Sequence, residues 1–98
     1  MIELYSANTP NGWKISIMLE EIGFDYKIIP LNLSDGDQFK AEFKKISPFN
    51  KIPVIVDKEN NNSIFESGVI LMYLGEKSKK FYPEKDRLMI NQWLMLVP

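Results

Sequence analysis

The chain has 98 residues, of which 45% are hydrophobic, and a formal net charge of -1, which fits a single domain with a modest core. Lys and Arg are scattered among Asp and Glu, so no basic face is available for a phosphate backbone, and we expect no nucleic-acid partner. The absence of cysteine and histidine excludes a disulfide scaffold, a thiol nucleophile of the chain's own, and the commonest metal ligand and general base. Any thiol chemistry must therefore use a reactive group supplied by a ligand, and we expect no metal.

The sequence has no N-terminal basic segment followed by an apolar stretch. It also has no run that approaches the roughly 18 apolar residues of a membrane span. We therefore expect a cytoplasmic protein with no membrane partner.

The first third of the chain predicts a βαβ unit. Ile2 to Tyr5 has the pattern of a strand, Asn11 to Ile22 that of an amphipathic helix that Gly23 ends, and Tyr26 to Leu33 that of a second strand. Pro30 cannot donate a hydrogen bond to a neighbouring strand, so we expect the second strand at an edge of the sheet. A strand, a helix and a strand within about 33 residues are typical of a parallel βαβ unit.

The rest of the chain predicts a helix, a hairpin and two further helices. After the loop 34–37 we expect a short helix with Phe39, Phe43 and Ile46 on one side, followed by a hairpin of Lys51–Asp57 and Ser63–Glu66. The next helix is expected over Ser67–Lys77, with Val69, Ile70, Tyr73 and Leu74 facing inward. A last helix is expected to have Pro83 at its first position. Met89, Trp93 and Leu96 form an apolar stripe on the last helix, which we expect to need a partner. The order βαβ, helix, ββα is that of a thioredoxin-like α/β fold.

Ile52-Pro53 stands at the start of the predicted hairpin. In thioredoxin-like folds this proline resembles a cis-proline that turns the N–H and C=O of the preceding residue outward, where they can pair with a peptide-like ligand. An ordinary trans-proline at the start of a strand is the alternative. The fold context favours the cis bond.

Glu66 and Ser67 stand at a junction between a strand and a helix. Ser67 at the helix N-cap would offer its hydroxyl, free N–H groups and the positive end of the helix dipole to a carboxylate. Glu66 beside it can hold an ammonium group. A serine cap alone is usually structural, but cap and acid together match the α-amino-acid end of a zwitterion.

The stretch from Ser6 to Gly12, SANTPNG, joins the first strand to the first helix. Thr9 and Pro10 can be the N-cap and first residue of this helix, which would make their role structural. In a thioredoxin-like fold, however, this junction faces the cis-proline and usually carries the redox cysteines, and Thr9 and Asn11 stand there instead. A hydroxyl or amide N–H can donate to a thiolate and lower its pKa, which suits a thiol brought by the ligand.

Three stretches in order, SANTPNG, QFKAEFKKISPFNKIPVIVD and IFESGVILMYL, resemble the N-terminal domain of glutathione S-transferases. The resemblance covers essentially the whole chain and is closest to the nu-class, to its disulfide-bond oxidoreductases and to nitrogen-catabolite regulators with a transferase fold. It implies a glutathione site in which Asn11 and Thr9 approach the sulfur and Ile52 and Pro53 meet the cysteinyl backbone. In the same site Glu66 and Ser67 would hold the γ-glutamyl end, and Gln38 and Lys51 would reach the glycine carboxylate. Tyr5 and Ser6 lie close to where other transferase classes place their catalytic hydroxyl, so they stay open as alternatives for the sulfur.

The resemblance also predicts that residues 1–79 form the glutathione-binding domain and residues 80–98 the linker and first helix of a following all-helical domain. In relatives that domain supplies the electrophile site, further glutathione contacts and much of the dimer interface. We therefore expect the full-length protein to be a homodimer that takes glutathione with a small electrophile or a mixed disulfide. The 98-residue chain is expected to be inactive alone.

Two functions remain open at this point. Family members of this type reduce mixed disulfides with glutathione, whereas a non-catalytic regulatory or protein-interaction module would keep the same residues. An independent glutaredoxin-like domain is disfavoured, because the chain has no cysteine.

Overall fold

A mixed four-stranded sheet with the strand order β2-β1-β3-β4 organises the chain in the computed structural model, which describes residues 1–96. β1 (Ile2–Ser6) pairs parallel with β2 (Tyr26–Pro30) and antiparallel with β3 (Val54–Asp57), and β3 pairs antiparallel with β4 (Asn62–Phe65). β2 therefore lies at an edge of the sheet, as Pro30 predicted. The topology confirms the thioredoxin-like fold.

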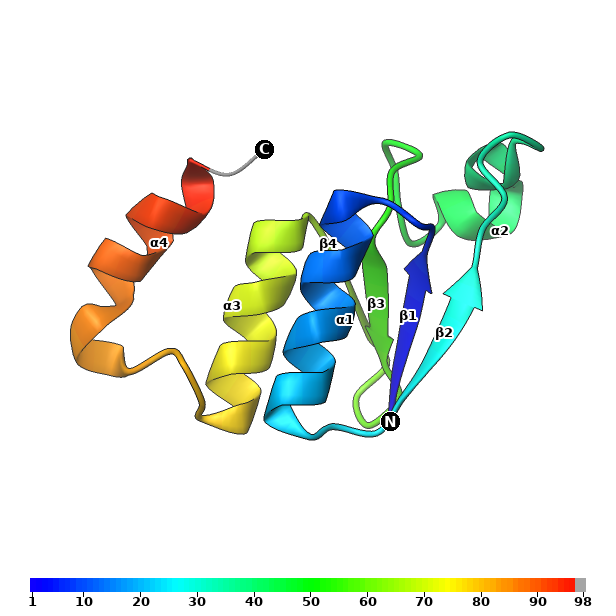
Figure 1. Ribbon diagram of the computed structural model, residues 1–98. Coiled ribbons are helices and arrows are strands. Elements are labelled where there is room, and N and C mark those ends of the chain that lie inside the picture. Colours follow the sequence, from blue (N-terminus) through cyan, green and yellow to red (C-terminus); the bar gives the residue numbers. More distant parts are fainter. Residues whose placement is uncertain (97–98) are drawn as a thin grey trace.

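α1 (Pro10–Ile22) and α3 (Ser67–Ser78) lie side by side on one face of the sheet (Figure 1). The core fills the space between them and the sheet, because β1 turns alternate residues toward the helices and each helix presents one face to the strands. The buried residues of this core cluster are Ile2, Leu4, Ile15, Leu19, Ile22, Ile55, Ile70 and Leu74. Val69, which was expected to face inward, is 45% exposed.

Thr9 and Pro10 begin α1 as the N-cap and the first helical residue, as predicted. The Thr9 Oγ1 accepts a hydrogen bond from the Gly12 N–H at 3.2 Å. Gly12 allows the helix to approach β1, because a Cβ there would lie 2.1 Å from the Oγ of Ser6. Gly23 ends α1 in the left-handed conformation with φ of 72°, and its N–H bonds to the last turn.

The segment between β2 and β3 differs from the prediction. β2 ends at Pro30 and not at Leu33, because the side chain of Asn32 and the carboxylates of Asp35 and Asp37 form a local turn. The expected single helix is divided into a 3-10 turn, η1 (Asp37–Phe39), and α2 (Ala41–Lys44). Of the three residues expected on the apolar side of that helix, only Phe43 is buried, and Phe39 is exposed. The Phe43 ring packs against the ring of Tyr5, with 6.2 Å between the two centroids.

The Ile52-Pro53 peptide bond is cis, as predicted. β3 begins at Val54, later than the expected Lys51. The prediction of Ser67 as the N-cap of the next helix was wrong: the N-cap is Glu66, and Ser67 is the first helical residue. The reason is the positive φ of 73° at Glu66, which turns the chain from β4 directly into α3.

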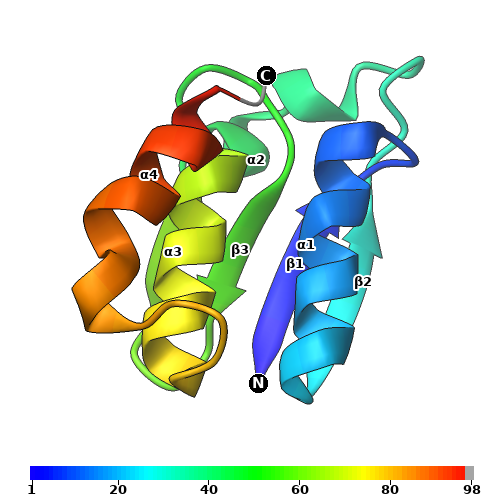
Figure 2. The ribbon, with the colours of Figure 1, turned by 60° about the vertical axis from the view of Figure 1, so that its left-hand side comes forward.

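After α3 come a 3-10 turn, η2 (Glu84–Asp86), and α4 (Arg87–Met95), which lies beside α3 on the side away from α1 (Figure 2). Pro83, expected to be the first residue of the last helix, is instead the N-cap of η2, because its ψ of 139° is extended. The predicted apolar stripe faces outward, since Trp93 is 67% exposed and Met89 and Leu96 are also exposed. None of the helices described over residues 1–96 combines the length and apolarity needed to cross a bilayer.

Candidate functional site

The N-terminal ends of α1 and α3, the C-terminal end of α4 and the loop that leads into β3 meet at one end of the molecule (Figures 1 and 2). A cavity of about 440 Å³ lies among them. The structure brings six of the eight predicted site residues into its lining: Asn11, Lys51, Ile52, Pro53, Glu66 and Ser67. These six residues come from three separate segments, and Leu94 and Met95 of α4 add a fourth.

Ile52 is one of the residues that line this cavity. Within residues 1–96 neither its N–H nor its C=O takes part in a hydrogen bond. The loop in front of it is anchored by Ser47, which is 1% exposed. The Ser47 Oγ donates to the Lys51 carbonyl at 2.7 Å and accepts from the Lys51 N–H at 3.0 Å. Sequence reasoning missed Ser47, whose signal is a hydroxyl directly before Pro48.

The N-terminus of α3 forms a second wall of the cavity. No side chain caps this helix, so the N–H groups of Ser67, Gly68 and Val69 have no partner within it and present partial positive charge. The first turn contains no acidic residue that would repel an anion. Glu66, exposed at the N-cap, adds one negative charge beside these donors. The arrangement can receive a carboxylate and an ammonium group next to each other.

Asn11 lies in the first turn of α1 and is half-buried against the cavity. Its Oδ1 accepts a hydrogen bond from the Lys14 ammonium at 2.8 Å. An amide whose oxygen is occupied in this way has its NH₂ group left as a donor. Asn11 can therefore donate to an electron-rich atom in the cavity.

Thr9 and Gln38, the other two predicted site residues, do not line this cavity. The Thr9 hydroxyl caps α1, and its side chain borders a separate shallow hollow beside Asn32 and Asp37. Gln38 lies in η1, and its Oε1 is buried without a hydrogen-bond partner among the described residues.

Tyr5 and Ser6, the alternatives for the sulfur, also lie outside the cavity. Tyr5 points to the face of the sheet opposite Leu4 and packs on Phe43. Burial, with a contribution from the charges of Glu3 and Glu42, raises the pKa of the Tyr5 hydroxyl above its usual value. Ser6 is buried and its hydroxyl donates to the Ala7 carbonyl at 3.2 Å. Of the four residues considered as partners of the sulfur (Asn11, Thr9, Tyr5 and Ser6), only Asn11 lines the cavity.

The remaining wall of the cavity is apolar and was not foreseen from the sequence. It is formed by Phe49, Phe65, Val69, Leu94 and Met95. The Phe49 and Phe65 rings meet edge to face, with centroids 6.4 Å apart. α4 approaches α3 so closely that a Cβ on Gly68 would lie 3.3 Å from the Met95 Cε. The only available signal was the apolar character of the last helix.

The glutathione S-transferase N-terminal domain family matches residues 1–76. The chain belongs to this family. Its relatives include the disulfide-bond oxidoreductase YfcG of Escherichia coli, which is 48% identical over 101 residues that cover 96% of this chain and 47% of YfcG. The transcriptional regulator URE2 of Saccharomyces cerevisiae is 35% identical over 99 residues, covering 89% of this chain and 27% of URE2.

A crystal structure of a glutathione transferase family member from Pseudomonas fluorescens, with two glutathione molecules bound, superposes with a TM-score of 0.91. It is 44% identical, and the match covers 97% of this chain and 44% of that one. The chain thus spans about half the length of the oxidoreductase and of the crystallised transferase.

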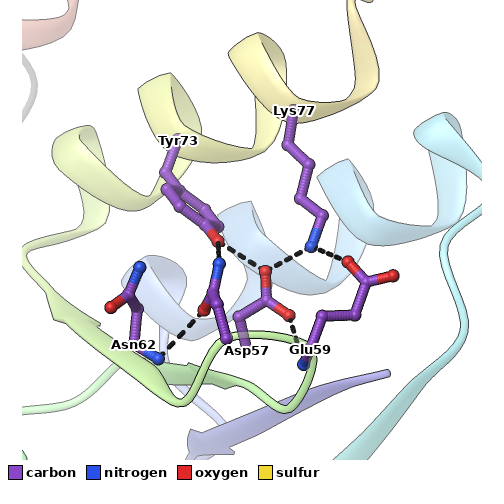
Figure 3. A network of polar contacts seen from close by, with 6 residues as sticks. Asp57, Glu59, Asn62, Tyr73 and Lys77 are labelled. Carbon is purple, nitrogen blue, oxygen red and sulfur yellow. Dashed lines mark hydrogen bonds and ion pairs between the residues drawn. The ribbon is translucent and has the colours of Figure 1, made fainter.

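This transferase-type domain contains a second polar cluster, which joins the end of β3 to α3 (Figure 3). Asp57 is fully buried and accepts hydrogen bonds from the Tyr73 hydroxyl, the Lys77 ammonium and the Glu59 N–H. Burial alone would raise the pKa of Asp57, but the bonds from Lys77, Tyr73 and Glu59 outweigh it, so its pKa lies below the usual value. The hydrogen bonds to Asp57 and Glu59 raise the pKa of Lys77. The cluster is separate from the cavity and ties helix to sheet.

Proposed function

We propose that this domain binds glutathione in the cavity between α1 and α3 and that the intact protein performs glutathione-dependent disulfide reduction or thiol transfer. The observation that carries the proposal is the convergence of the free Ile52 main chain, the uncapped N-terminus of α3 and the Asn11 amide on one cavity. The glutathione bound to the similar Pseudomonas fluorescens protein supports it.

The ligand's two ends have separate places in this proposal. The γ-glutamyl carboxylate binds at Ser67 and the free N–H groups of α3, while its ammonium pairs with Glu66. The cysteinyl N–H and C=O pair with the main chain of Ile52, as an added strand would. Lys51 reaches the glycine carboxylate. Gln38 is the second candidate for that contact, and its amide N–H would be the donor.

The chemistry concerns the ligand's sulfur, since the chain has no thiol of its own. Asn11 donates an N–H to the glutathione thiolate and stabilises the ionised form. Thr9 supports this arrangement through the cap that begins α1. The thiolate then attacks the glutathione sulfur of a mixed disulfide, which forms glutathione disulfide and releases the other half as a thiolate.

The second substrate and the assembly belong to the intact protein. A small electrophile or mixed disulfide would rest on the apolar wall that includes Phe49 and Met95. We further propose a homodimer that acts in the cytoplasm. No role for a metal is part of this proposal.

A regulatory module without catalysis is the alternative, and the similarity to the transcriptional regulator URE2 favours it. Both functions would retain glutathione binding, so binding alone does not separate them. Turnover does: reduction of a glutathione mixed disulfide by the intact protein supports the enzyme, and binding with no turnover supports the regulator.

The test is calorimetric titration of the intact protein with glutathione, followed by an assay of mixed-disulfide reduction. Ser67→Ala and Glu66→Gln should each weaken binding by about tenfold, since the first removes a hydrogen bond to the ligand carboxylate and the second removes the negative charge that pairs with the ligand ammonium. Ser63→Ala, at an exposed position in β4, is the matched control and should bind like the parent. An intact protein that does not bind glutathione would contradict the proposal.

A further inference from the structure

We propose that Lys14 is a positioning residue for the sulfur: its ammonium fixes the orientation of the Asn11 amide so that the NH₂ group, and not the carbonyl, is presented to the cavity. This inference rests on the proposed glutathione site. It assigns a role to a side chain that does not line the cavity itself.

The contact follows from the helical geometry of α1. Asn11 and Lys14 are three residues apart in the helix, so their side chains lie on the same face. The Lys14 Nζ lies 2.8 Å from the Asn11 Oδ1, which is the distance of a charge-assisted hydrogen bond. Both side chains are half-buried. The pair is thus shielded from water on part of its surface.

The chemistry of the two groups allows one orientation of the amide. An asparagine side chain has an oxygen that accepts and an NH₂ group that donates, and the two are nearly equal in size. A lysine ammonium has three donors and no acceptor. Lys14 can therefore hold the oxygen of Asn11 but not its nitrogen, so the nitrogen is the end left for the cavity.

The orientation decides the sign of the interaction with a thiolate. An amide N–H stabilises a negative sulfur, whereas an amide carbonyl in the same place repels it. Without Lys14 the amide would be able to flip by rotation about one bond, and both orientations would be populated. Asn11 is then a weaker donor on average, although its side chain is unchanged.

A direct effect of the Lys14 charge on the sulfur is the competing explanation. Loss of the positive charge of Lys14 would by itself raise the pH midpoint of the bound thiol, because any change in charge near the sulfur shifts it. Lys51 and Glu66, which line the cavity, already contribute charges of opposite sign there. The two explanations differ in one respect. A positioning effect requires Asn11, and a direct charge effect does not.

The experiment compares Lys14→Met, Lys14→Arg, Asn11→Ala and the double variant in the intact protein. Glutathione affinity is measured by calorimetry, and ionisation of the bound thiol by its ultraviolet absorbance as a function of pH. Lys27→Met, at an exposed position in β2, is the matched control. We expect Lys14→Met to raise the pH midpoint of thiolate formation by about half a pH unit to one pH unit, with less than about a threefold loss of affinity.

Lys14→Arg should keep the pH midpoint of thiolate formation close to that of the parent, because a guanidinium also donates and does not accept. In the Asn11→Ala background, Lys14→Met should change the midpoint by much less than in the parent. An equal shift in both backgrounds would overturn the positioning role in favour of direct charge, and an unchanged midpoint in Lys14→Met would overturn any role in ionisation.

A failure of the proposed function would look different. In that case the parent protein would not bind glutathione in the calorimeter, and Lys14 would have no bound sulfur to act on. The contact itself has an independent readout without ligand: the Asn11 side-chain NH₂ signals in a nitrogen-proton NMR spectrum. These signals should move in Lys14→Met and stay in place in Lys27→Met, and signals that do not move would contradict the proposed contact.

Discussion

Tyr82 in the linker packs directly on Gly75 of α3, where an added Cβ would lie only 2.7 Å from the Tyr82 Cβ. The same tyrosine stacks beneath the Arg87 guanidinium, 4.7 Å from the ring centroid, and donates a hydrogen bond to the Asn91 Oδ1 at 2.6 Å. Through these contacts the close approach at Gly75 sets where α4 lies. It thereby sets the position of Leu94 and Met95 in the cavity wall.

Gly75→Ala should therefore destabilise the protein by about 1 to 3 kcal/mol, even though alanine favours helix formation, because the added methyl group displaces the linker. Denaturant unfolding measures this loss. Tyr82→Gly removes the Cβ that the new methyl group meets, so Gly75→Ala should be nearly neutral when Gly75→Ala/Tyr82→Gly is compared with Tyr82→Gly alone. A Gly75→Ala protein as stable as the parent would show that the linker does not pack on α3.

The buried carboxylate of Asp57 is expected to contribute to stability through the cluster with Tyr73 and Lys77. Asp57→Asn would leave the Lys77 ammonium without its buried partner. We expect a loss of about 2 to 3 kcal/mol, below the usual value for a buried ion pair because Lys77 is partly exposed. Denaturant unfolding at neutral pH measures it. Asp25→Asn, at an exposed carboxylate, is the control and should change stability little.

The lowered pKa of Asp57 also predicts how the stability of the folded protein changes with pH. The carboxyl is a stronger acid in the folded chain than in the unfolded chain, so its contribution is complete above the unfolded pKa of about 3.9 and is lost as pH falls through the folded value. The parent should therefore lose stability more steeply below about pH 4 than Asp57→Asn does. Parallel acid unfolding curves for the two proteins would contradict this prediction.

Asn11→Ala should raise the pH midpoint of the bound glutathione thiol by about one to two pH units, because one charge-assisted hydrogen bond is lost. Mixed-disulfide reduction should slow, with only a modest loss of glutathione affinity. Ser67→Ala should mainly weaken binding instead. An unchanged pH profile and rate in Asn11→Ala would mean that another group activates the sulfur, with Thr9, Ser6 and Tyr5 next in line.

The exposed stripe on α4 is expected to drive association or packing against a further part of the protein. Trp93 and Leu96 are exposed over most of their surface, and such patches favour interfaces. Trp93→Ser should reduce self-association in analytical ultracentrifugation, and Lys85→Ser, at an exposed position in η2, should not. A parent chain that sediments as a monomer at high concentration would argue against self-association through this stripe.

Most of the fold was predictable because the elements carry their own local signals. Thr9-Pro10 and Gly23 mark the two ends of α1, and Pro30 marks an edge strand. The exceptions arise where side chains bond locally to the main chain or where the backbone turns unusually. The Asn32 turn shortens β2, and the positive φ of Glu66 moves the start of α3.

The candidate site was predictable where it depends on main-chain groups that follow from the order of the elements: the residue before the cis-proline, Ile52, and the N-terminal end of α3, although its cap is Glu66 and not Ser67. The Asp57 cluster was not, because its partners stand 16 and 20 residues further along the chain and only the folded sheet brings them together. Tyr5 illustrates a signal that was present but unused. Period-two alternation in β1 already places it on the face opposite Leu4 and away from α1.

The open start of α3 has a consequence for the motion of the free protein. The Ile70 N–H is held by the Glu66 carbonyl at 2.9 Å, whereas the three amides before it have no helical partner. Those three amide protons should exchange with solvent fastest in the helix, and the strained turn at Glu66 should be the first part of α3 to open. Occupancy of the site would then appear as slowed exchange confined to Ser67, Gly68 and Val69, a signal that needs neither turnover nor a spectroscopic label.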